Sequence, residues 1–248
     1  MEKISLAIPY YNNSRFMYNT LLYPSKDDRI NEIIICDDKS EDLDDLNKII
    51  KSINSDKIKV IINNENLGVY LNKIRSLKYC TNERAILFDS DNILDENYVN
   101  ILYTKEWDEK TIYLSGFVSK IDDYNNVFDS FDYRKYEGVI DKLNFKDKNY
   151  NEILFKTMMN TCNYFVPVKK YIECSEKNSI EYDTKLISAL DSITLLSDWL
   201  VDGNAFDVIK DLTYKHRIHQ NSSYLKYANK IDEAAWINIL YKKILKDG

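Results

Sequence analysis

Residues 85–92, Ala-Ile-Leu-Phe-Asp-Ser-Asp-Asn, constrain this chain most, because an apolar strand pattern ends there in two closely spaced carboxylates. Residues i and i+2 of a strand share a face, so we expect Asp89 and Asp91 to meet at one point just beyond the strand. Mg²⁺ and Mn²⁺ prefer such oxygen ligands and commonly bind phosphate oxygens as well. The pattern predicts a divalent cation that serves a nucleotide diphosphate; the alternative is a turn rich in acidic residues.

The first hundred residues alternate between strand and helix patterns. Apolar runs predict strands, the first of them stopped at Pro9, and amphipathic runs predict helices. The strands are expected at residues 4–8, 32–36, 57–62 and 84–88, and the helices at residues 14–22, 43–53 and 69–79. This alternation predicts an α/β fold with a mainly parallel central sheet flanked by helices.

Sheets of this kind bind ligands beyond the carboxyl ends of their strands. Each of the four predicted strands is followed there by carboxylates, amides or aromatic rings. The residues are Tyr11 and Asn12, Asp37 and Asp38, Asn63 to Asn66, and Asp89 to Asp91. We therefore expect one edge of the sheet to hold the functional site.

The second half of the chain has a weaker periodicity. Strands are predicted at residues 111–115, 162–168 and 205–209, a helix at 182–201, and an amphipathic helix at 230–245. Residues 120–151 are expected to form a mobile or variable region, either over an acceptor site or merely decorative. The length favours one domain at residues 1–223, with halves at 1–106 and 107–223, followed by a C-terminal helix at 224–248.

Composition excludes several classes of protein. A net charge of −6 argues against a nucleic-acid surface, and five scattered glycines argue against a dinucleotide fingerprint or a P-loop. Four scattered cysteines indicate free thiols rather than disulfides or zinc ligands. The mean hydropathy of −0.46 and the lack of a long apolar run predict a cytoplasmic protein. Lysines near the C-terminus leave open a peripheral contact with a membrane or a partner enzyme.

Five segments in the right order resemble the family 2 glycosyltransferases of the GT-A fold. The first strand and its Pro-x-Tyr-Asn ending, the Asp-Asp-Gly-Ser turn with Lys39 in place of glycine, and the Asp-x-Asp signature are all recognisable. The segments are residues 4–12, 32–40, 66–73, 89–92 and 214–223. The resemblance is dense over residues 4–103 and absent over residues 117–155.

This resemblance implies an inverting transfer of sugar from a nucleotide-sugar donor, a UDP-sugar above all, to an acceptor hydroxyl. It implies that Mn²⁺ or Mg²⁺ is bound by Asp89, Asp91 and His219. The donor site would comprise Pro9, Tyr11, Asp38, Lys73, Asp89 and Ser90. The usual Glu-Asp pair of the family is missing, so Asp191 is expected as the general base, with Asp198 as the second candidate.

Structural readings of the same residues stay open. Asp37 and Asp38 would then cap the helix near residue 43, Lys73 would be solvated, and His216 and Arg217 would pack against the closing loop instead of contacting the diphosphate. At the level of function, the alternatives are a non-catalytic relative that binds nucleotide sugars, a nucleotidyltransferase, and an interaction module.

Overall fold

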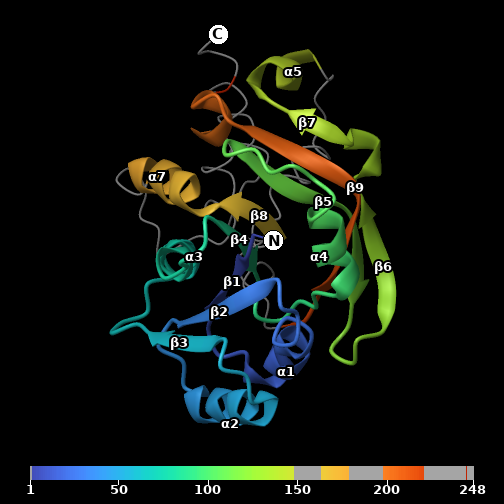
Figure 1. The fold of residues 1–248 in the computed structure, drawn as a ribbon. Coiled ribbons are helices and arrows are strands. Elements are labelled where there is room, and N and C mark those ends of the chain that lie inside the picture. The colour runs from blue at the N-terminus through green and yellow to red at the C-terminus, as the bar shows by residue number, and fades with distance from the viewer. Residues whose placement is uncertain (1, 148–162, 179–197, 221–243, 245–248) are drawn as a thin grey trace.

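A computed structural model describes residues 2–147, 163–178, 198–220 and 244. One mixed sheet runs through it in the strand order β3-β2-β1-β4-β8-β5-β9-β7, and β6 pairs with β5 outside this path (Figure 1). The strands are β1 (Ile4–Tyr10), β2 (Ile30–Asp37), β3 (Ile58–Ile62), β4 (Arg84–Phe88), β5 (Thr111–Ile121), β6 (Val127–Asp132), β7 (Gly138–Ile140), β8 (Asn163–Pro167) and β9 (Ala205–Arg217). The α-helices are α1 (Ser14–Leu22), α2 (Leu43–Ile53), α3 (Val69–Lys78), α4 (Glu96–Leu102), α5 (Lys142–Asp147) and α7 (Val168–Asn178), and η1 (Arg134–Tyr136) is a 3₁₀ turn.

The α/β class and the parallel first half of the sheet are confirmed. Strands β1 to β4 pair in parallel, and the antiparallel pairing of β8 with β4 extends the sheet toward the second half. The expected end of the first strand at Pro9 is wrong, because β1 continues to Tyr10 and Pro9 pairs with Cys36. Pairing with β4 ends at Ala7. Beyond Ala7 only one side of β1 is paired, which is where proline is tolerated.

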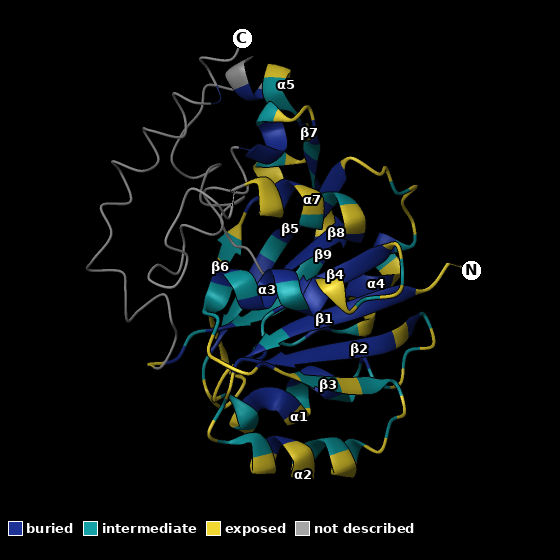
Figure 2. Cartoon of the chain, turned by 90° about the vertical axis from the view of Figure 1, so that its left-hand side faces the viewer, coloured by how far each residue is buried: buried dark blue, intermediate teal, exposed yellow. Residues whose placement is uncertain are grey.

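The helices form layers on the two faces of the sheet. Helices α3 and α7 lie side by side over one face, and α4 packs against β9 on the other (Figures 1 and 2). From β1 the chain proceeds to β2 and β3 and then returns to β4 on the other side of β1. This reversal makes the carboxyl ends of β1 and β4 the place where α/β sheets open a crevice for ligands.

The interpretation of residues 120–147 as a loop is wrong, while their variability and a place over the acceptor stay predictions. These residues contain the end of β5, all of β6 and β7, and α5, while residues 148–151 lie outside the described part. Strand β6 is exposed along nearly all its length, so the residues on its two faces do not alternate between apolar and polar. The pattern that normally reveals a strand is therefore missing.

The strand β9 is also longer than expected. The predicted strand at 205–209 and the segment that follows it form one strand of 13 residues. Its middle carries the exposed pair Lys210 and Asp211, opposite an irregularity in β5 at Gly116. A Cβ at Gly116 would lie 2.7 Å from backbone atoms of Lys210, so the close approach of β5 and β9 requires glycine there.

Three of the four cysteines, Cys36, Cys80 and Cys174, are free thiols, as predicted, and Cys162 lies outside the described residues. Burial raises the pKa of each of the three to about 12. No helix in the described ranges has the length and apolar character needed to cross a membrane. Of the predicted C-terminal helix at 224–248, only Ile244 is described; it is helical and buried.

Candidate active site

Side chains join the carboxyl ends of β1, β2 and β4, as the sequence predicts. The Asn13 amide donates to Ser90 Oγ at 3.0 Å and so joins the residues after β1 to those after β4. The Asn12 backbone N–H donates to Ser40 Oγ at 2.9 Å and joins the residues after β1 to those after β2. The site therefore lies where the direction of the strand order reverses.

Asp89 and Asp91 do not share a strand face, so that part of our reasoning is wrong. Strand β4 ends at Phe88, and the backbone N–H of Asn92 donates to the Asp89 carbonyl at 3.3 Å, which closes a turn. The buried Asn92 holds this turn: its amide donates to Asn163 Oδ1 at 3.0 Å, and its carbonyl accepts from Thr20 at 2.8 Å. The turn directs Asp91 toward the residues that follow β9.

Asp91 and His219 form the central pair of the site. His219 Nε2 lies 2.9 Å from Asp91 Oδ2, and the two residues are 128 positions apart in the chain. The histidine ring packs on Phe16, with ring centroids 5.1 Å apart. Its second nitrogen, Nδ1, lies 3.2 Å from the Arg15 guanidinium. The structure therefore brings together two of the three residues that the resemblance implies as metal ligands, and the metal role itself stays a prediction.

Arg217 holds the Asp91 turn in place and is 1% exposed. Its Nε donates to the Asp91 carbonyl at 2.9 Å, and its terminal nitrogens donate to the Asp122 carbonyl and to Asn125 Oδ1. Its guanidinium also stacks over Phe16 at 4.3 Å from the ring centroid. The structure thus shows Arg217 bound and packed within the protein, and a contact with a diphosphate stays a prediction.

The site brings together two of the three expected metal ligands. In the described ranges, no group of three or more His, Cys, Asp or Glu residues converges to hold an ion, so Asp89 does not complete the expected set with Asp91 and His219. The Asp91 and His219 donor atoms are 2.9 Å apart, and neighbouring ligands at about 2.1 Å from a six-coordinate ion lie about 3 Å apart. The Asp91 carboxylate and the His219 imidazole therefore fit two adjacent coordination positions of such an ion. Phosphate and water would fill its other positions.

Asp38 is buried at the end of β2 and organises the loop that leads into α3. Its carboxylate accepts from the backbone N–H groups of Leu67 at 2.7 Å and Gly68 at 2.9 Å, and from Asn63 at 3.0 Å. The alternative that Asp37 and Asp38 cap the helix near residue 43 is wrong, because Asp42 is the N-cap residue of α2. Asp37 instead accepts from the backbone N–H of Ser40 at 3.1 Å.

The other residues predicted to bind the nucleotide-sugar donor are Lys73, Tyr11 and Pro9. Lys73 on α3 is only 6% exposed, so a solvated lysine is excluded. Its neighbour Asn72 donates to the Cys36 carbonyl at 2.9 Å, which ties α3 to β2. Tyr11 is 53% exposed just after β1 and is accessible to a ligand, whereas Pro9 lies within β1.

The two candidates for the general base have different outcomes. Asp191 lies outside the described residues. Asp198 is 8% exposed and directly precedes Trp199, whose indole donates to the Ala205 carbonyl at the start of β9. A strand of 13 residues spans about 40 Å, and His219 follows its far end. The structure therefore does not bring Asp198 to the Asp91–His219 pair.

Arg15 is a site residue that our reading of the sequence missed. It lies in the first turn of α1 and contacts both His219 and Asp123. It belongs to none of the motifs. The available signal was a basic residue in the first turn of a helix that begins at the carboxyl end of β1, where ligands of such sheets bind.

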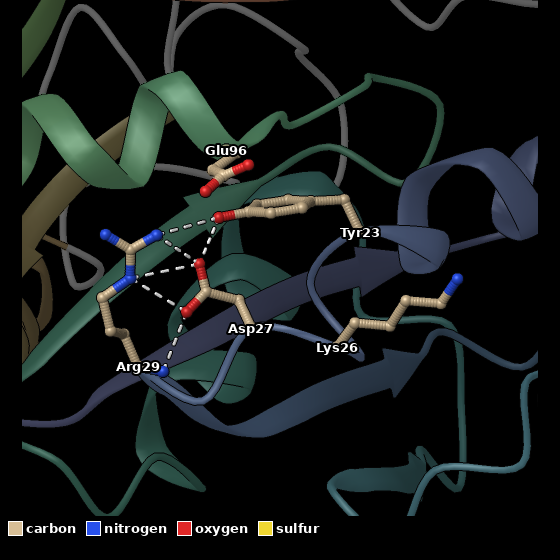
Figure 3. Close-up of a pocket in the computed structure, with 5 residues that line it drawn as sticks. All are labelled: Tyr23, Lys26, Asp27, Arg29 and Glu96. Atoms are coloured by element: carbon tan, nitrogen blue, oxygen red, sulfur yellow. Dashed lines mark hydrogen bonds and ion pairs between the residues drawn. The ribbon is translucent and has the colours of Figure 1, made fainter.

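A surface pocket of about 370 Å³ lies elsewhere, at the amino end of β2, where Tyr23, Lys26, Asp27, Arg29 and Glu96 line it (Figure 3). Arg29 and the Tyr23 hydroxyl both donate to the Asp27 carboxylate, and Lys26 points away from them. The polar groups at its centre therefore bind one another. We therefore expect this cluster to stabilise the fold rather than to bind a ligand.

The stability of the protein is expected to depend on pH through Asp27. Burial alone would raise the pKa of its carboxyl, but hydrogen bonds from Arg29 and Tyr23 outweigh burial and hold the pKa at about 2, below the ordinary 3.8. The ionised form therefore stabilises the fold by about 2 kcal/mol above pH 4, and this contribution is lost as the pH falls through 2. Urea unfolding of the wild type and Asp27→Asn should show a stability gap that narrows between pH 6 and pH 2.5. A gap that does not change with pH would contradict this assignment.

Comparison with known structures shows the fold. The chain is similar to the crystal structure of S. aureus TarS 1–349, at 18% identity and a TM-score of 0.64, over 99% of this chain and 71% of that one. A structure of the same TarS segment in complex with UDP-GlcNAc has 17% identity and a TM-score of 0.67, over 99% of this chain and 66% of that one. The predicted GT-A fold is thereby confirmed.

Sequence comparison shows the family. No curated protein matches the chain. The family model described as Glycosyl transferase family 2 matches residues 5–172, which contain β1 to β4, the Asp91 turn and β8. Because this match covers more than half of the 248 residues, the chain belongs to glycosyl transferase family 2 and is a glycosyltransferase.

Proposed function

We propose that the protein transfers a sugar from a UDP-sugar to an acceptor hydroxyl, with inversion at the anomeric carbon and with the help of Mn²⁺ or Mg²⁺. The observation that carries the proposal is the Asp91–His219 contact of 2.9 Å at the reversal of the strand order. A carboxylate and an imidazole at that place suit a cation shared with a diphosphate. The UDP-GlcNAc bound to the similar TarS structure supports a uridine donor.

Asp91 and His219 would hold the cation, and Asp89 would contact it through water or bind the donor ribose. A bound divalent cation offsets the negative charge that grows on the departing nucleoside diphosphate. Imidazole favours Mn²⁺ over Mg²⁺. Arg217 keeps the turn rigid through the Asp91 carbonyl, so the Asp91 carboxylate needs little reorganisation when charge develops.

The donor base and ribose are proposed to lie over the ends of β1 and β2. Asp38 keeps the loop at residues 67 and 68 in place, and Tyr11 offers an exposed ring just after β1. Lys73 and Ser90 are proposed to complete the donor site. A general base must then remove the proton of the acceptor hydroxyl, and Asp191 is proposed for that role.

A screen of nucleotide sugars by thermal unfolding tests this function without knowledge of the acceptor. With Mn²⁺ present, UDP-sugars should raise the melting temperature more than GDP- or ADP-sugars do, since a ligand at a hundred times its Kd stabilises by about 2.7 kcal/mol. Slow, metal-dependent hydrolysis should accompany the preferred donor. Stabilisation without hydrolysis or transfer would favour the non-catalytic relative instead. No stabilisation by any nucleotide sugar would contradict the proposal.

A further inference from the structure

A network of buried side chains joins the carboxyl ends of β2 and β3 to helix α3. Asp38 directly follows β2, Asn63 directly follows β3, and Asn72 lies on α3. Each of these residues is 3% exposed. The Asn63 amide donates to Asn72 Oδ1 at 2.9 Å and to Asp38 Oδ1 at 3.0 Å. The network therefore lies inside the protein, at the strand ends where the donor base is proposed to bind.

The backbone fixes the direction of these hydrogen bonds. Asn72 Nδ2 donates to the carbonyl of Cys36 in β2 at 2.9 Å and to that of Tyr10 in β1 at 3.4 Å. Carbonyls only accept hydrogen bonds, so Nδ2 of Asn72 faces them and its Oδ1 faces Asn63. This oxygen needs a donor, which turns the amide nitrogen of Asn63 toward Asn72 and Asp38. Asn63 Oδ1 then accepts from the Cys36 thiol at 3.6 Å.

The network ends on the loop that leads into α3. The Asp38 carboxylate accepts from the backbone N–H groups of Leu67 and Gly68. Gly68 has a φ of 82° and is the N-cap residue of α3. Its carbonyl accepts from the backbone N–H of Asn72 at 3.0 Å. The network is therefore closed: it begins and ends on α3, and it holds the loop in a fixed position relative to β1 and β2.

Stability alone does not explain why these residues are polar. When all partners of a buried hydrogen bond are replaced by apolar groups of the same shape, the change in stability can be close to zero. Apolar side chains, however, do not impose a direction on the groups that they contact. A polar network with every member satisfied specifies one arrangement of the segments it joins. The segment fixed in this way is the loop at residues 67 and 68.

We propose that Asn63 and Asn72 are positioning residues for the donor: through Asp38 they hold residues 67 and 68 where the nucleobase binds. Both amides are buried, so the ligand does not touch them. This inference rests on the proposed function and deepens it, because it assigns affinity for the base to residues separate from those that hold the diphosphate. Asp91 follows β4, on the opposite side of β1 from β2, so the two parts of the site can be tested separately.

Isothermal titration of UDP into Asn72→Leu tests the proposal. Leucine has the branched shape of asparagine but cannot hold the Asn63 amide. With Mn²⁺ present, UDP should bind about three- to thirty-fold more weakly than to the wild type, the range for residues that act on a site without contacting its ligand. The factor by which Mn²⁺ tightens UDP binding should stay as in the wild type, because the Asp91 turn is unchanged.

A second variant keeps the test valid if Asn72→Leu does not fold. The single substitution leaves an N–H of Asn63 and the Cys36 carbonyl without their partners, which destabilises the fold. Asn63→Leu/Asn72→Leu removes both amides together, leaves fewer buried groups unpaired and should be more stable. It should show at least the same loss of UDP affinity, which a role in stability alone does not predict.

Asn82→Leu is the matched control. The Asn82 amide donates to Ser5 Oγ at 2.9 Å and to Asn31 Oδ1 at 2.7 Å, in a polar network at the amino ends of β1 and β2. This variant should bind UDP as the wild type does.

Three results would overturn the inference and leave the proposed function standing. These are unchanged UDP affinity in the variants that lack the Asn72 amide, loss of the Mn²⁺ effect together with the affinity, and an equal loss of UDP affinity in Asn82→Leu. If the wild type binds no UDP with Mn²⁺ present, the proposed function fails and the inference fails with it.

Discussion

The Asp91→Asn variant is expected to transfer sugar about 10²- to 10³-fold more slowly than the wild type, the range found when one group that stabilises developing charge is removed. The substitution takes away the charge that would hold the cation but leaves an oxygen that accepts from His219 Nε2, now 2.9 Å away. The Asp91 carbonyl still accepts from Arg217. The turn should therefore keep its shape, and the loss should appear in kcat rather than in stability.

Steady-state kinetics across a range of Mn²⁺ concentrations checks this result. Asp129→Asn provides the control, because Asp129 is an exposed aspartate whose ion pair is with Lys120 at 2.6 Å and not with His219. The control should retain wild-type rates. An Asp91→Asn enzyme with an undiminished rate would exclude Asp91 from the chemistry, whatever its contact with His219.

The Arg217→Met variant is expected to have the largest effect on stability, a loss of about 3–5 kcal/mol, as when one partner of a buried polar network is removed. The substitution leaves the carbonyls of Asp91 and Asp122 and the side chain of Asn125 without their donor. A buried acceptor left unpaired costs about 1–3 kcal/mol, and Asp91 and Asp122 are partly buried, whereas the exposed Asn125 can bond to water instead. The contact with Phe16 is lost as well.

Urea unfolding of Arg217→Met and Arg217→Lys separates the contribution of the Arg217 charge to stability from that of its planar shape. Lysine keeps the charge but loses the planar fork that reaches these acceptors at once, so it should recover only a minor part of the stability. Arg134→Met, at an exposed ion pair, should change stability by less than about 1 kcal/mol. Full stability of Arg217→Met would show that the turn does not depend on this side chain.

The first half of the fold could be predicted because its elements have the patterns that simple rules describe. Every residue of β4 is buried, and all of them except Arg84 are apolar, which gives an uninterrupted apolar run at residues 85–88. Helix α1 buries only the face that includes Phe16, Met17 and Leu21, which gives a helical period. In contrast, β6 is exposed on both faces, so its sequence has no apolar side. In β9 the charged pair Lys210 and Asp211 interrupts the apolar residues. Local sequence patterns therefore do not predict the extent of these two strands.

The site itself was only partly predictable, for physical reasons that concern distance along the chain. The motif identified Asp91, but the strand rule that we used to orient it does not apply beyond Phe88, where a turn begins. The contact of Arg15 with His219 joins residues 204 positions apart. No local pattern encodes such a contact, since it follows from how α1 and the end of β9 pack around Phe16.

The central claim is that a cation held at Asp91 and His219 binds the diphosphate of the donor. Isothermal titration of UDP, with and without Mn²⁺, into the wild type and Asp91→Asn tests it most directly. The account predicts that Mn²⁺ tightens UDP binding by about ten-fold or more in the wild type, a coupling of about 1.4 kcal/mol, and not in the variant. Equal UDP affinity with and without Mn²⁺ in the wild type would contradict it.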